Sequence, residues 1–94
     1  MSIVRIPTVL RPQVGGNKEV ELAGATVREV VDALTAEYPS LASQLMTADG
    51  ELNRFVNVYV NGQDVRYLEG LSTPVGERDE VRLLPAMAGG AHAS

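Results

Sequence analysis

The chain has 94 residues and a formal net charge of −4, with 45% apolar and 21% charged residues. A chain of this size and composition has room for one globular domain with one modest core. It contains no cysteine, which excludes disulfides, thiolate metal sites and thiol catalysis. Its arginines are scattered between acidic residues, so we do not expect nucleic acid as a partner, because phosphate backbones require a clustered basic face.

The apolar runs of the sequence are too short to cross a membrane, which takes roughly 20 residues. The N-terminus also lacks the basic-then-apolar order of a signal peptide. We therefore expect no membrane association and a cytoplasmic location.

The first residues predict an N-terminal hairpin. Residues 3–6 (IVRI) are typical of a strand, which we expect to continue through residues 8–10, with Pro7 marking a bulge because it removes one ladder donor. Turn residues fill positions 11–17, and the alternation of residues 19–22 (EVEL) predicts the second strand.

A helix is predicted to begin at Thr26. Thr26 and Glu29 have the spacing of a capping box, in which each side chain accepts a backbone N–H of the first turn. Apolar residues then fall on one face, at positions Val27, Val30, Val31, Leu34 and Tyr38. Pro39 should end this helix, because the residue before a proline avoids helical angles, and residues 41–46 suggest a second, short helical segment.

The second half of the chain predicts three strands. Residues 55–60 (FVNVYV) alternate and are followed by an Asn-Gly pair, a strong hairpin signal, so residues 65–67 are expected to form the return strand. Residues 80–84 (EVRLL) predict the last strand, which Pro85 ends. Alternation alone leaves open which side chains of residues 55–60 face the helix.

This order of elements predicts the α+β class and fits a ubiquitin-like β-grasp: a mixed sheet packed against one main helix, with the first and last strands parallel neighbours. Residues 1–85 would form the β-grasp domain, and residues 86–94 a flexible C-terminal arm that contains Gly89 and Gly90. This glycine pair stands out by its position, five residues after the last strand. The composition of the tail alone also fits a frayed chain end.

No group of residues suggests an enzyme. The one histidine, His92, lies in the tail, where no helix or strand would hold it near another catalytic group. The acidic pairs at residues 49 and 51 and at residues 79 and 80 are expected to be solvated turn residues. No phosphate-binding glycine loop or metal-ligand cluster is present, so we expect no metal and no bound cofactor.

Three stretches, IPTVLRP, RFVNVYVNGQDVR and LLPAMAGG, together with the order of elements, resemble the ThiS/MoaD family of ubiquitin-like sulfur carriers, and within it the CysO type of cysteine biosynthesis. The resemblance implies that an E1-like adenylating enzyme uses ATP to activate the Gly90 carboxylate. The resulting thiocarboxylate would donate sulfur to a biosynthetic enzyme that makes cysteine or another sulfur-containing metabolite. The chain would then be a monomeric protein co-substrate.

The same resemblance implies roles for the residues around Gly90. Met87, Ala88 and Gly89 would be recognised in the partner's channel, where a glycine lets the backbone approach closely. Residues 91–94 mask the Gly90 carboxyl group, so a JAMM-type metalloprotease would cut between Gly90 and Ala91. A cloning remnant is the alternative origin of these four residues.

Three apolar side chains are candidates for a partner face: Phe55, Tyr59 and Leu84, each of which could equally be core. A second function also stays open at this point. The chain could be a ubiquitin-like protein modifier or binding module that conjugates or docks through the same tail and sheet face.

Overall fold

The structure, a computed structural model, describes residues 2–85. Its strands are β1 (Ser2–Arg5), β2 (Glu19–Leu22), β3 (Val56–Val60), β4 (Gln63–Asp64) and β5 (Glu80–Pro85). Its α-helices are α1 (Val27–Glu37) and α2 (Ala42–Leu45). Short 3-10 helices cover Thr8–Val14, Pro39–Leu41, Val65–Tyr67 and Gly70–Ser72. None of the helices in these residues is long and apolar enough to cross a membrane.

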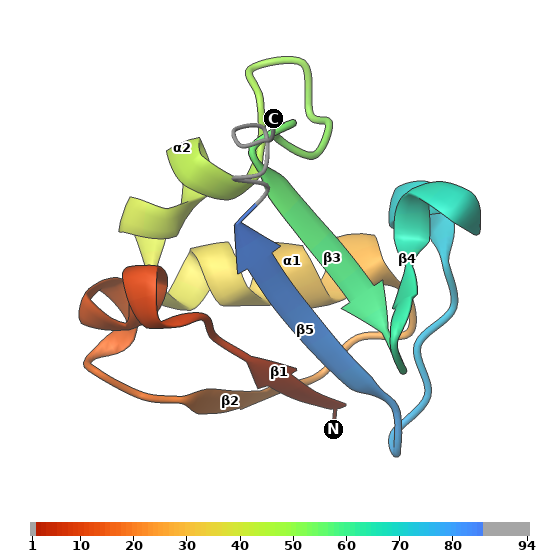
Figure 1. Ribbon diagram of the computed structural model, residues 1–94, viewed down its shortest axis with the longest axis horizontal. Helices are drawn as coiled ribbons and strands as arrows, with labels where there is room; N and C mark the ends of the chain where they lie inside the picture. Colours follow the sequence, from red (N-terminus) through yellow and green to blue (C-terminus); the bar gives the residue numbers. More distant parts are fainter. Residues whose placement is uncertain (1, 86–94) are drawn as a thin grey trace, which may run out of the picture.

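The five strands form one mixed sheet in the order β2-β1-β5-β3-β4, with α1 lying across one face (Figure 1). β1 runs antiparallel to β2 and parallel to β5, with Val4 beside Val81. β5 is antiparallel to β3 along its other edge. The first and last strands are therefore parallel neighbours, as the β-grasp prediction requires.

The core lies between the sheet and α1. Buried apolar residues alternate along β1, β3 and β5, and the helix contributes Val27, Val30, Val31 and Leu34 from one face. Val56, Val58 and Val60 are the buried side chains of β3, at 5%, 0% and 6% exposure. This settles the alternation that the sequence left open: Asn57 and Tyr59 point to the opposite, open face of the sheet.

Helix α1 begins and ends where the sequence predicts. The Thr26 Oγ1 accepts a hydrogen bond from the Glu29 N–H at 3.2 Å, and the Glu29 carboxylate accepts the Ala25 N–H at 2.9 Å. The reciprocal bond thus reaches one residue further back than in the usual capping box. The helix ends at Glu37, two residues before Pro39, and residues 39–45 form the expected short helical segment.

The first strand is shorter than predicted. β1 ends at Arg5, and residues 8–14 form a 3-10 helix instead of continuing the strand. Pro7 removes a ladder donor, and its carbonyl oxygen accepts the Leu10 N–H at 2.9 Å to close the first helical turn. Leu10 and Val14 are buried in this helix, so apolar residues that resembled a strand reach the core by helical spacing.

The predicted return strand is also displaced. The strand that pairs with β3 is β4, Gln63–Asp64, whereas residues 65–67 form a 3-10 helix. The Asp64 carboxylate accepts the Arg66 N–H at 2.8 Å and so caps this helix. Val65 is fully buried, which explains why the helix turns inward at that point.

Candidate functional site

The root of the C-terminal arm is the end of β5. Pro85 is the last described residue, and it lies opposite Val56 at the beginning of β3. β5 is bonded to β1 on one edge and β3 on the other, so the strand that carries the arm is central in the sheet (Figure 1). The pairing with β1 covers Glu80–Arg82 and the pairing with β3 continues to Pro85, so β3 holds the end of the strand to which the arm is attached.

The predicted reacting group and tail lie outside the described residues. They comprise Gly90, the recognition residues Met87, Ala88 and Gly89, and the processing site between Gly90 and Ala91. The predicted division into a domain and an arm is likewise not tested at residues 86–94. These assignments stay predictions from the sequence.

An apolar groove flanks Pro85 on the side of the short helices. Its lining includes Val9, Leu10, Phe55, Val56 and Pro85. Val9 is 62% exposed and Phe55 68% exposed, although both are large and apolar. Phe55 was predicted from the sequence to be a partner residue, but Val9 was not, because it was assigned to a strand. The prolines at positions 7 and 12 were the signal that this segment leaves the sheet.

The loop that carries Phe55 is held by Arg66. The two terminal nitrogens of Arg66 donate to the Asn57 side chain at 2.6 Å and to the carbonyl oxygens of Asn53 and Val56 at 3.0 and 2.9 Å. The Asn53 side chain in turn accepts the Phe55 N–H at 2.9 Å. These bonds fix the position of the exposed phenyl ring relative to the beginning of β3.

The open face of the sheet carries the other two predicted partner residues. Tyr59 and Leu84 line one shallow pocket together with Arg82, which lies opposite Tyr59 in the sheet. Leu84 is 37% exposed, whereas its neighbour Leu83 is 1% exposed. The structure therefore brings Tyr59 and Leu84 together on one face and places Phe55 in the separate groove beside Pro85.

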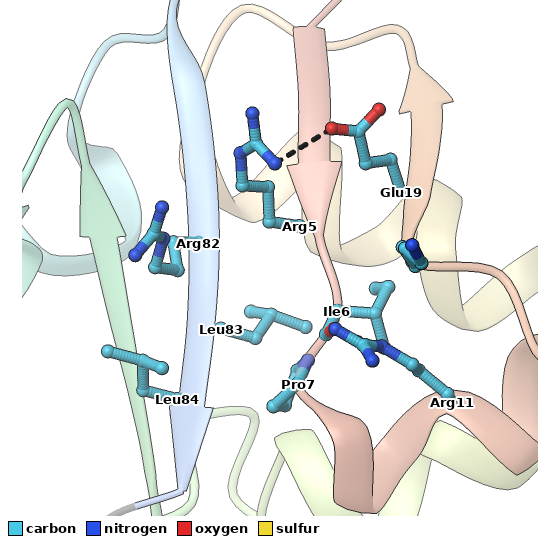
Figure 2. A pocket seen from close by; sticks show the side chains of 9 residues that line it. Arg5, Ile6, Pro7, Arg11, Glu19, Arg82, Leu83 and Leu84 are labelled. Atoms are coloured by element: carbon cyan, nitrogen blue, oxygen red, sulfur yellow. Dashed lines mark hydrogen bonds and ion pairs between the residues drawn. The ribbon is translucent and has the colours of Figure 1, made fainter.

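A second hollow on the open face lies close to the arm root, and Figure 2 shows its lining. We call it the basic hollow; its residues are Arg5, Ile6, Pro7, Arg11, Lys18, Glu19, Arg82, Leu83 and Leu84. Sequence analysis did not identify it, because its cations come from separate parts of the chain. They meet only because β1 and β5 pair side by side, with Arg5 beside Arg82.

Among the cations of the basic hollow, Arg5 has the most acidic partners. It forms an ion pair with Glu19 at 2.8 Å and bonds to Glu80 through its Nε. The hydrogen bond from Arg5 lowers the pKa of the Glu80 carboxyl group below its ordinary 4.5.

The acidic neighbour of Glu80, Asp79, is bonded within a turn. Asp79 accepts the Gly76 N–H at 2.7 Å and the Asn61 side-chain amide at 2.9 Å, and these bonds lower its pKa. This arrangement closes the turn before β5. Among residues 2–85, no group of His, Asp and Glu side chains could hold a metal ion.

The sequence and the fold were compared with known proteins. The ThiS family model matches residues 4–90. A sulfur carrier protein CysO from Mycobacterium tuberculosis is 47% identical over 89 residues, which cover 93% of this chain and 96% of that protein. Small archaeal modifier protein 1 from Haloferax volcanii is 36% identical over 81 residues, covering 83% of this chain and 88% of that protein.

Solved structures agree with these matches. A BexX/CysO complex from Amycolatopsis orientalis contains a chain that matches with a TM-score of 0.87 and 43% identity, covering 96% of this chain and 100% of that one. The crystal structure of Mycobacterium tuberculosis CysO gives a TM-score of 0.86 at 44% identity, covering 93% of this chain and 100% of that one. The predicted β-grasp fold is confirmed, as is the general function of a sulfur carrier protein that is not itself an enzyme. The chain belongs to the ThiS family.

Proposed function

We propose that the chain carries sulfur as a thiocarboxylate on Gly90 and delivers it to an enzyme that makes cysteine or a related sulfur-containing metabolite. The observation that carries the proposal is the place of the arm: it leaves the central strand of a β-grasp sheet, and the match to the ThiS family ends at Gly90 itself. The similarity to CysO proteins supports cysteine synthesis as the destination of the sulfur.

The chemistry follows from a terminal acyl group. A glycine carboxylate is ionised at neutral pH and is a poor electrophile. An E1-like adenylating enzyme would use ATP to convert the Gly90 carboxylate into an acyl-adenylate with release of pyrophosphate. Sulfide from a sulfur donor would then displace AMP and leave the thiocarboxylate. The chain needs no cysteine for this role, because the sulfur is bonded to the main-chain carbonyl carbon of its last residue.

Residues 91–94 would have to be removed first, because the Gly90 carboxyl group forms a peptide bond with Ala91. A JAMM-type metalloprotease is the class of enzyme we propose for this step. The full chain would then be an inactive precursor, and removal of its last four residues would make the Gly90 carboxylate available for activation. A cytoplasmic location stays a prediction from the sequence.

The test uses chains of two lengths. A chain that ends at Gly90 should gain the mass of one oxygen-to-sulfur exchange when incubated with the E1-like enzyme, ATP and sulfide. The full chain should not gain it until the protease has acted. Absence of both an AMP ester and a thiocarboxylate on the shorter chain would disprove the proposal.

A second function is favoured by one comparison, the 36% identity to an archaeal small modifier protein. In that case the same activated Gly90 would be transferred to a lysine of another protein. The two functions differ in product. Mass spectrometry after incubation with a cell extract would detect an isopeptide in the second case and a thiocarboxylate without conjugates in the first.

A further inference from the structure

The basic hollow concentrates positive charge on an acidic protein. Four cations and Glu19 line it, and the Glu80 carboxylate bonds to Arg5 at its edge, so the local net charge is +2, whereas the whole chain carries −4. The rest of the molecule therefore carries −6. Such a separation gives the protein a strong charge asymmetry, with its positive end beside the last residues of β5.

Three of the four cations keep donors available. Arg82 has one acidic neighbour, Glu80, at 3.7 Å. Arg11 donates through Nε to the Ile6 carbonyl oxygen at 3.1 Å, and within residues 2–85 its two terminal nitrogens form no ion pair. Within residues 2–85, Lys18 forms no ion pair. Arg5, by contrast, is held by Glu19 and Glu80.

The hollow also lies where a partner that receives the arm must come close. Leu84 lines it and is followed directly by Pro85, the root of the arm. In Figure 2, Leu84 and Arg82 lie on one side, and Arg11 and Pro7 on the other. A protein that binds the tail residues will cover this face, which mixes apolar surface with cations as docking surfaces do.

We propose that the basic hollow docks carboxylate side chains at the entrance of the E1-like enzyme that activates the arm. This inference rests on the proposed function. Acidic residues at that entrance would attract the hollow and repel the remaining surface with its charge of −6, so encounters in which the arm points toward the enzyme are favoured. Charges arranged in this way act mainly on the association rate and on its salt dependence.

The experiment uses the chain that ends at Gly90, the form that the proposed function activates, and the purified E1-like enzyme from the same organism. The variant Arg11→Gln/Lys18→Gln/Arg82→Gln removes the three available cations and lowers the net charge by three. Arg28→Glu/Arg78→Gln lowers it by the same three units and is the matched control, because both arginines are exposed outside the hollow, on α1 and in the turn before β5. Stopped-flow measurements at low and at physiological salt give the association rate constant. We expect the triple variant to associate about tenfold more slowly at low salt and to lose most of the salt dependence. The control variant should change the rate less than about twofold.

Several outcomes would overturn the proposal. They are an unchanged association rate in the triple variant, an equal loss in Arg28→Glu/Arg78→Gln, and the absence of binding by the unsubstituted chain. An NMR titration with inorganic phosphate and with a hexaglutamate peptide separates a small-anion site from a docking surface: phosphate binding at the hollow as tight as peptide binding would also overturn it. Thiocarboxylate formation by a chain that ends at Gly90 tests the proposed function independently.

Discussion

Replacing Leu83 or Leu84 with alanine separates the two faces of β5. Leu83 is 1% exposed and packs in the core beneath α1, whereas Leu84 is 37% exposed on the open face. Each substitution removes the same three carbon atoms from adjacent positions of one strand. A difference in stability between the two variants therefore reports burial and not propensity.

The expected magnitudes follow from that burial. Removing three fully buried carbons costs about 2.4 kcal/mol in transfer free energy, at about 0.8 kcal/mol for each. The cavity left at Leu83 adds to this, so Leu83→Ala should cost about 3 to 4 kcal/mol of unfolding free energy. Leu84 is about two-thirds buried and solvent can fill the space it leaves, so Leu84→Ala should cost about 1.5 kcal/mol at most.

Thermal and urea unfolding of the full chain, followed by circular dichroism, measures both costs. A gap of about 2 kcal/mol corresponds to roughly 8–16 °C in Tm for a domain of this size. In the activation assay the order should reverse, because Leu84 is exposed on the open face: Leu84→Ala should weaken the use of the chain by the E1-like enzyme more than Leu83→Ala does, where that variant is folded. Stability losses that agree within about 0.5 kcal/mol would refute the assignment of the two faces.

Two further predictions concern the segments that fix α1 and β5. Gly24→Ala should destabilise the protein by about 1 to 3 kcal/mol in urea unfolding, because the new Cβ would lie 2.8 Å from the backbone nitrogen of Val30; an unchanged midpoint would contradict it. Asp79 has a pKa below its ordinary 3.8 because of the Gly76 N–H and then Asn61, so it contributes stability above that pH that is lost as the pH falls through the lower, folded value. Asp79→Asn should therefore flatten the acid side of a stability–pH curve, and an unchanged slope below the ordinary pKa would exclude the effect.

The elements with strong local signals could be predicted from the sequence. The capping pair at Thr26 and Glu29, the apolar spacing of α1 and the Pro39 stop are local, and each lies where expected. The strands β3 and β5 alternate clearly and have matching registers. Their order then limits the topology to very few arrangements, of which the β-grasp is one.

The failures occurred where short apolar runs carry no periodicity of their own. Residues 8–10 and 65–67 are predicted as strands, but both lie in 3-10 helices that place a few apolar side chains in the core. Three or four residues cannot distinguish the two periods, and tertiary packing decides. The basic hollow could not be predicted from the sequence for another reason. Arg5 and Arg82 are neighbours only through the parallel pairing of β1 with β5.

The pairing of β5 on both edges explains how one strand can serve both the fold and a partner. Val81 and Leu83 point into the core, while Arg82 and Leu84 point to the open face beside the arm. A substitution on one face leaves the other in place, because hydrogen bonds to β1 and β3 hold the strand in register. The pairing with β1 ends at Arg82, so the last residues of β5, up to Pro85, are held by β3 alone. The register with β3 therefore has to hold the end of the strand while an enzyme binds the tail.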